Sequence, residues 1–198
     1  MSWKAEFLIQ AAIATLLVGG AASVAPAGEE PEAPASSCAG ESPPALAAPA
    51  GNEFAFELLA EGVQVYSCDA AASGPAWAFD APEARLFDRH GQLAATHRAG
   101  PTWAAVDGSS VLGAKLEAAT PDPAAIPWLL LRAASHHGGR GRMADVTYVQ
   151  RVQTSGGVAP REGCNEASLG LVARVPYRAV YCFYRGRGVR PDGDSPRL

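Results

Sequence analysis

The sequence lacks the short motifs by which several common chemistries are recognised. It has no Cys-x-x-Cys pair, which argues against a zinc ribbon or a thioredoxin-like redox site. No Gly-x-Ser-x-Gly segment surrounds a serine, so nothing indicates the nucleophile of a Ser-His-Asp hydrolase. No Gly-x-Gly-x-x-Gly segment follows a strand and opens a helix, so the sequence provides no dinucleotide site. We therefore expect no cofactor.

An excess of basic residues is also absent. The chain has 16 lysines and arginines against 20 aspartates and glutamates, a net charge of −4, and its arginines are scattered rather than arranged in a stripe. A phosphate backbone selects clustered cations and a basic balance. We therefore expect no nucleic acid among the partners.

The first 27 residues have the features of a cleaved signal peptide. Lys4 supplies a positive charge, residues 8–18 form an apolar run, and Ala25-Pro-Ala27 offers small residues before a cut. Gly19-Gly20 interrupts the apolar run before it reaches the roughly 20 residues that a bilayer span needs. We therefore expect residues 1–27 to be removed, and the mature chain to be secreted or periplasmic and without a transmembrane span.

The remaining chain divides by composition into three parts. Residues 28–51 are rich in proline and alanine and predict a disordered linker. Residues 52–184 have the length and hydrophobic patterning of a single β domain. Residues 185–198 alternate charge with glycine and proline, without an apolar period, and predict a flexible tail.

Period-two alternation dominates the predicted domain. Turn signals at Asp88–Gly91 and Asp107–Ser110 indicate hairpins, and residues 127–133 are apolar on both sides, with a predicted partner strand at residues 146–152. The pattern predicts an all-β fold, an antiparallel sandwich or barrel-like domain with little helix. Trp128, which precedes three leucines, is expected in the core.

Three places in the pattern predict ends of strands. Two strands are expected to join around Glu61-Gly62, Pro82 is expected to end a short strand, and separate strands are expected before and after Pro176. With these breaks we predict about nine to eleven short strands, as in sandwiches and barrels.

Cysteine use agrees with export. Cys38, Cys68, Cys164 and Cys182 all follow the predicted cleavage site. In an oxidising compartment they are expected to form disulfides, and four cysteines allow three pairings that their spacing does not distinguish.

Several separate segments, in the same order, resemble the secreted family catalogued as domain of unknown function 3455. The resemblance spans roughly residues 52–184, and the family is uncharacterised, so it implies no activity. The segments are Glu61-Gly-Val-Gln-Val-Tyr-Ser-Cys68, His97-Arg-Ala-Gly-Pro-Thr-Trp103, Ala125-Ile-Pro-Trp-Leu-Leu-Leu131, Val149-Gln-Arg-Val-Gln-Thr-Ser-Gly-Gly-Val-Ala-Pro160 with Cys164, and Tyr177-Arg-Ala-Val-Tyr-Cys-Phe-Tyr184.

The resemblance also bears on the disulfides. Cys68 and Cys164 lie within family segments, whereas Cys182 stands where the family pattern is more often aromatic and Cys38 lies outside the domain. The resemblance therefore implies a Cys68–Cys164 bridge, with Cys38–Cys182 as the second pair.

Aromatic residues give the best candidates for a binding site. His97 and Trp103 flank the turn dipeptide Gly100-Pro101, which is expected to bring an imidazole and an indole to one end of the sheet. Tyr66 adds aromatic surface, and such rings stack on sugars or close over apolar ligands in a barrel mouth. We predict His97, Trp103 and Tyr66 as ligand-binding residues of a module for a glycan, a small apolar molecule or a protein.

Other chemistries find less support. No residue is predicted to be catalytic, although a hydrolase that uses His97 with an unidentified carboxylate is an alternative, and so is a structural envelope-associated protein. His136 and His137 with His97 would offer three nitrogens to a metal, but adjacent strand residues point to opposite faces. We therefore predict no metal site.

Overall fold

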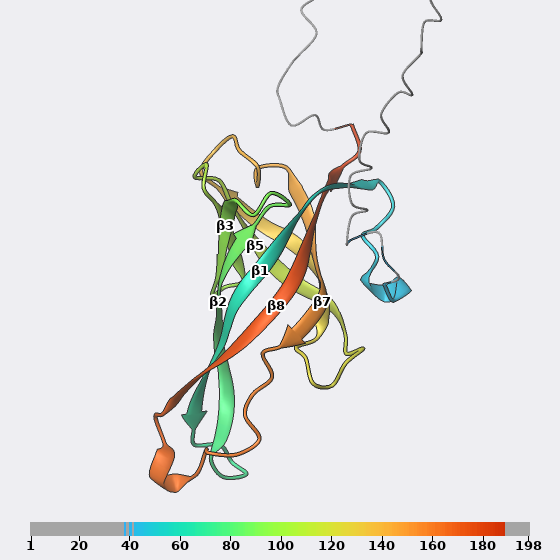
Figure 1. Ribbon diagram of the computed structural model, residues 1–198. Helices are drawn as coiled ribbons and strands as arrows, with labels where there is room; N and C mark the ends of the chain where they lie inside the picture. The colour runs from blue at the N-terminus through green and yellow to red at the C-terminus, as the bar shows by residue number, and fades with distance from the viewer. Residues whose placement is uncertain (1–37, 39, 41, 189–198) are drawn as a thin grey trace, which may run out of the picture. The chain divides into compact units, whose positions relative to one another are not determined.

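The structure is a computed structural model that describes residues 38, 40 and 42–188 (Figure 1). The predicted signal peptide lies outside the described residues, as do residues 28–37 of the predicted linker and residues 189–198 of the predicted tail. None of the helices in the described part of the chain is long and apolar enough to cross a membrane.

Eight antiparallel strands form a single sheet that closes into a barrel, with each strand paired to its neighbours in the chain and β1 paired to β8. The all-β prediction is confirmed, and the architecture is the barrel. The strands are β1 (Asn52–Asp69), β2 (Ala76–Phe87), β3 (Leu93–Arg98), β4 (Thr102–Ala105), β5 (Ser110–Ala119), β6 (Trp128–His137), β7 (Val146–Gly156) and β8 (Val172–Gly186). Two short 3-10 segments, η2 (Pro44–Leu46) and η3 (Glu166–Ser168), complete the described elements.

Alternation along the strands fills the barrel. In β1 the even-numbered residues Leu58, Ala60, Gln64 and Tyr66 are buried, and Leu58 and Ala60 join the core cluster. The predicted hairpins at Asp88–Gly91 and Asp107–Ser110 connect β2 to β3 and β4 to β5, and β6 pairs with β7 as expected.

The predicted break at Glu61-Gly62 is wrong, because β1 runs through it. An added Cβ at Gly62 would lie 2.2 Å from the carbonyl oxygen of Glu83 and 2.5 Å from the Cα of Ala84, both on β2. The glycine therefore marks a close approach of two backbones rather than a turn.

The predicted breaks at Pro82 and Pro176 are also wrong. Pro82 lies in β2 beyond Ala84, the last residue that pairs with β3. Pro176 lies in β8 beyond Tyr177, where pairing with β7 ends. Each proline keeps a neighbour on β1 and lies where the strand pairing on its other side has ended, a position that tolerates a residue without an N–H. The carbonyl oxygen of Pro176 still accepts a hydrogen bond from the backbone of Gly157. Three pairs of expected strands are therefore single strands.

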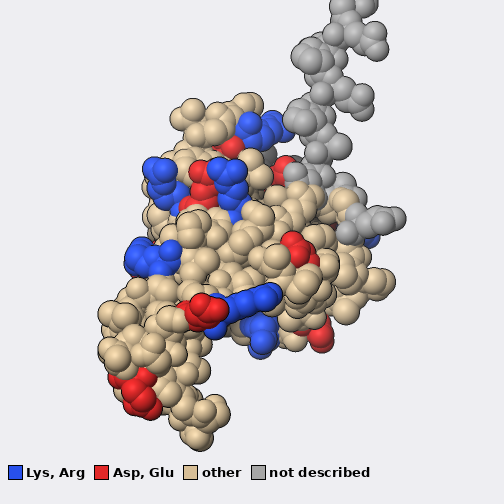
Figure 2. All heavy atoms as spheres, turned by 60° about the horizontal axis from the view of Figure 1, so that its bottom comes forward, with Lys and Arg blue, Asp and Glu red and all other residues tan. Residues whose placement is uncertain are grey.

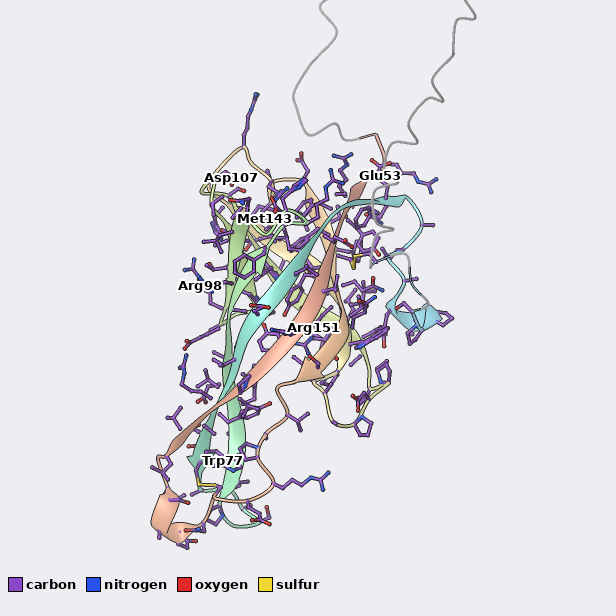
Figure 3. All side chains as sticks on the ribbon, viewed as in Figure 1. Glu53, Trp77, Arg98, Asp107, Met143 and Arg151 are labelled. Carbon is purple, nitrogen blue, oxygen red and sulfur yellow. A yellow bond between two sulfur atoms is a disulfide. The ribbon has the colours of Figure 1, made fainter. Side chains whose placement is uncertain are left out.

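The antiparallel order gives the barrel two distinct ends. We call the end with the turns at residues 88–92, 106–109 and 138–145 the sealed end, and the end with residues 99–101 and 120–127 the mouth end. Beyond the mouth end β1, β2 and β8 continue as a three-stranded extension, visible in the lower half of Figure 1. Figure 3 shows Asp107 and Met143 at the sealed end, Arg151 midway and Trp77 in the extension.

Two disulfides are present, so the expectation of disulfides is confirmed. Cys68 is bonded to Cys164 and Cys38 to Cys182, the same pairs that the family resemblance implied. The first bridge joins the end of β1 to the loop before β8, in the extension. The second ties the N-terminal segment to the outer wall. Such bridges form in oxidising compartments.

Part of the predicted linker packs on the barrel. Leu46 is fully buried, and its carbonyl oxygen accepts a hydrogen bond of 2.8 Å from the Gln150 side chain. Trp128, expected in the core, is only partly buried and packs in an outer cluster that includes Cys38 and Cys182. The Cys38–Cys182 bridge, which the linker composition alone does not reveal, holds this segment against the wall.

Candidate ligand-binding site

A cavity of about 300 Å³ lies inside the barrel and reaches the surface at the mouth end. Its walls are mostly aromatic and aliphatic, and the three candidate residues His97, Trp103 and Tyr66 all line it. The other lining residues are Gln64, Phe79, Asp80, Pro82, Gly100, Pro101, Lys115, Ile126, Pro127, Leu129, Leu131, Arg151 and Tyr181. The structure therefore brings the predicted binding residues to one place.

His97 and Trp103 form a stacked pair on neighbouring strands. They are direct register partners of β3 and β4, and their rings lie 4.5 Å apart at an interplanar angle of 9°. Tyr181 contacts both rings edge-on. The Gly100-Pro101 turn thus places the imidazole and the indole together, as the sequence indicated, but both side chains are buried in the barrel rather than exposed.

The environment of His97 keeps its imidazole neutral. Burial lowers the pKa of His97 to about 3, against the opposing effect of its hydrogen bond to Thr102 and with help from the positive charge of Arg151. The Nδ1 atom lies 3.0 Å from the carbonyl oxygen of Thr102, so Nδ1 carries the proton and donates it. The Nε2 atom is consequently an acceptor.

Tyr66 is anchored on the opposite side of the cavity. Its hydroxyl donates a hydrogen bond of 2.7 Å to the carbonyl oxygen of Gly157, and its ring contacts Phe79 edge-on. Burial raises the pKa of Tyr66, so the phenol stays protonated. An added Cβ at Gly157 would lie 2.8 Å from Tyr177 and 2.9 Å from Ile126, and its φ of +78° favours glycine. Gly157 is therefore needed for the loop to reach Tyr66.

Arg151 is the charged side chain of the cavity wall. It is 9% exposed, and its Nε and Nη2 atoms both donate to the carbonyl oxygen of Pro127, at 3.0 and 2.8 Å. Within residues 42–188 it forms no ion pair. A buried cation is ordinarily paired with an anion, because removing the charge from water costs on the order of several kcal/mol.

Two uncharged side chains of the cavity wall each have a buried N–H donor without a hydrogen-bond partner. The Gln64 Nε2 and the Trp103 Nε1 are fully buried, and neither donates a hydrogen bond to any described residue. Both residues line the same cavity as Arg151. Buried donors are nearly always hydrogen-bonded in folded proteins, so these two donors are exceptions, and both belong to residues of one cavity wall.

The rim of the cavity carries one charge of each sign. Lys115 and Asp80 are exposed and line the mouth, and Asp80 accepts a hydrogen bond from Ser67. With Arg151 the cavity therefore has two cations and one anion. Figure 2, turned so that this end comes forward, shows acidic and basic side chains interspersed on the surrounding surface, without a continuous patch of one sign.

The histidines outside the cavity have structural partners. The Nε2 of His136 lies 2.7 Å from the carbonyl oxygen of Val146, to which it donates, and His137 contacts Ser135. Among residues 38, 40 and 42–188, no three His, Cys, Asp or Glu side chains come together as metal ligands.

Arg151 and Gln64 were not among the residues predicted from the sequence to bind a ligand, although a signal for them exists. Gln64 has the same strand parity as Tyr66, and Arg151 has the same parity as Val149, which is fully buried. A polar residue on the inward parity of a strand is the signal that would have identified both.

The chain belongs to the family described as protein of unknown function (DUF3455), whose model matches residues 49–185. The resemblance found in the sequence is thereby confirmed. No curated protein and no solved structure matches the chain.

Proposed function

We propose that this protein is a secreted or periplasmic binding module that holds a small, largely apolar molecule inside its barrel. The observation that carries the proposal is the cavity of about 300 Å³, walled by aromatic and aliphatic side chains and containing buried donors without partners. Ligand sites are typically apolar cavities of about 300–1,000 Å³ with a few placed polar groups. The volume suits a small ligand better than an oligosaccharide.

Binding is favoured over hydrolysis by the state of His97. A pKa of about 3 makes the imidazole a weak base at neutral pH, and efficient general bases have pKa values near the working pH. Its protonated nitrogen is committed to the carbonyl of Thr102 rather than to a carboxylate. The pair of His97 and Trp103 is better suited to forming a rigid wall than to moving a proton.

Uptake of the neutral fluorescent probe N-phenyl-1-naphthylamine tests the proposal. The folded protein should bind the probe with an increase in fluorescence. Leu129→Trp, which fills the cavity, should weaken binding at least about tenfold, since overpacking removes the site. Leu116→Trp is the matched control, because Leu116 is 43% exposed and does not line the cavity. Absence of probe uptake, or equal uptake by Leu129→Trp, would overturn the proposal.

Export is the second part of the proposal. It rests on the leader features of residues 1–27 and is supported by the two disulfides. When the full chain is expressed in a secreting host, the intact mass of the exported protein should correspond to a chain beginning at Gly28 with no free thiol. Retention of the leader would contradict this part alone.

A further inference from the structure

The further inference concerns the chemical class of the ligand, and it rests on the proposed binding function. It starts from Arg151, a nine-tenths buried guanidinium whose described hydrogen bonds both go to one carbonyl oxygen. A guanidinium has five N–H donors in a planar fork that matches a carboxylate. Its Nη1 atom donates to no described residue, so part of this fork is available to a ligand.

The orphaned donors point to the same ligand chemistry. Gln64 Nε2 and Trp103 Nε1 both need an acceptor, as does the free part of the Arg151 fork. Among these wall groups the donors outnumber the acceptors, of which the Nε2 atom of neutral His97 is one. A neutral alcohol brings one oxygen with two lone pairs and no charge, whereas a carboxylate brings two oxygens with about four lone-pair sites and a negative charge.

The remaining walls specify the rest of the ligand. Leu129, Leu131, Ile126, Tyr181 and Phe79 offer apolar contact between the interior and the mouth. Phe79 is 55% exposed, so the apolar path continues to the surface of the extension. The cavity thus combines a donor-rich interior with apolar walls.

We propose that the cavity recognises a small amphipathic monocarboxylic acid, whose carboxylate is bound by Arg151 with hydrogen bonds from Gln64 or Trp103, and whose apolar part lies against the leucine and aromatic walls. The charge of the ligand then pairs the buried cation, and its oxygens satisfy donors that the fold leaves open. The two sources of such chemistry, an aliphatic and an aromatic acid, are distinguished by the probes.

The test compares octanoate with 1-octanol, which have the same chain length and differ in the acid group, by displacement of N-phenyl-1-naphthylamine. Wild-type protein should bind octanoate at least about tenfold more tightly than octanol, the ratio expected for a charge-assisted hydrogen bond. Arg151→Gln should abolish this preference, so that octanoate binds no more tightly than octanol. Arg98→Gln is the matched control, because Arg98 is exposed and lies outside the cavity, and it should leave both affinities unchanged.

A second variant keeps the test decisive if Arg151→Gln does not fold. Gln64→Met keeps the length of the side chain and removes an amide that makes no hydrogen bond, so the barrel should stay folded. It should weaken octanoate binding about fivefold relative to octanol. Benzoate and benzyl alcohol repeat the comparison for an aromatic acid. Whichever of octanoate and benzoate binds more tightly indicates whether the ligand is an aliphatic or an aromatic acid.

The outcomes separate the two proposals. Equal binding of octanoate and octanol, and of benzoate and benzyl alcohol, by wild-type protein would overturn the acid specificity and leave the binding module standing. An acid preference that survives in folded Arg151→Gln would also overturn it, as would an undiminished preference in Gln64→Met when Arg151→Gln does not fold. Failure of the protein to take up the neutral naphthylamine would instead overturn the binding function itself.

Discussion

The two ends of the barrel treat their buried polar atoms differently. At the sealed end the hydroxyl of Ser109, a fully buried residue, donates to Asp107 and accepts from the backbone N–H of Met143. Asp107 also accepts from the backbone of Ser109 and of Arg142. Toward the mouth end Gln64 and Trp103 leave donors without partners.

This difference shows which buried polar atoms the fold satisfies by itself and which it leaves without hydrogen-bond partners. The loops of the sealed end satisfy one another, and Met143 fills the interior beneath them. The interior toward the mouth is left with open donors and a cavity, although the same sheet encloses both. The hydrogen bonds of the sealed end are expected to contribute to stability, whereas the open donors toward the mouth are expected to cost stability. Four measurements of unfolding compare these regions.

Of the four changes, the one with the largest expected loss of stability lies in the extension beyond the mouth end. The Cys68–Cys164 bridge closes a sequence separation of 96 residues, and removing it with Cys68→Ala/Cys164→Ala should lower the free energy of unfolding by about 4 kcal/mol, by the chain-entropy estimate. Guanidinium unfolding measures the change. A loss below about 1 kcal/mol would mean that other contacts, such as the hydrogen bond from Trp77 to Glu162, hold the extension.

Breaking the hydrogen bonds of the sealed end should have the next largest effect. Asp107→Ala removes the acceptor for three donors and should lower the free energy of unfolding by about 2–3 kcal/mol. Asp122→Ala is the control at the mouth end, where Asp122 accepts one backbone hydrogen bond, and should cost less than about 1 kcal/mol. Equal effects of the two variants would remove the contrast between the ends.

Burial of His97 should make the stability of the protein depend on pH in mildly acidic solution. His97 has a pKa of about 3 in the folded state against 6.5 unfolded, so the unfolded chain binds the extra proton and stability is lost as pH falls from about 6.5 toward 3. Between pH 7 and pH 5 wild-type protein should lose about 2 kcal/mol more than His97→Phe, measured by denaturant unfolding at each pH. His90→Gln, at an exposed histidine, should behave as wild type.

The smallest expected effect is a gain of stability, caused by a substitution of Gln64. Gln64→Met removes a buried donor without a partner, and should raise the free energy of unfolding by about 1 kcal/mol in the absence of ligand. Gln92→Met at an exposed position is the control and should change little. Destabilisation by Gln64→Met alone would mean that the amide has a structural role.

Much of the fold follows from local patterns. Alternation and turn chemistry predicted the all-β class and the hairpins around Asp88–Gly91 and Asp107–Ser110. The strand count was too high, because Gly62, Pro82 and Pro176 were interpreted as ends. Whether a glycine or proline ends a strand depends on the strand beside it, and the β-strand partners of these three residues lie far away in the chain.

Closure of the sheet into a barrel could not be predicted either, because it also depends on strands that are far apart in the chain. A sandwich and a barrel show the same alternation of inward and outward residues along their strands. What distinguishes the barrel is the pairing of β1 with β8, for example of Asn52 with Gly186, and this pairing has no signature in the local sequence.

The candidate site was predicted in part. A turn dipeptide and three aromatic or imidazole side chains indicated His97, Trp103 and Tyr66, and all three line one cavity. Arg151 and Gln64 were missed because each looks like an ordinary polar residue of a strand. Among the described residues Arg151 has no ion-pair partner and the Gln64 amide nitrogen has no hydrogen-bond partner, and both facts are visible only when the surrounding strands are in place.

The pairing of Asn52 with Gly186 also determines how the protein can be tethered. The chain enters and leaves the sheet side by side at the sealed end, and the backbone of Arg187 donates to that of Gly51. A bead, a fluorescent partner or an anchor joined after β8 is thus attached at the end away from the entrance to the cavity. Immobilised in this way, the domain would present its opening to the medium.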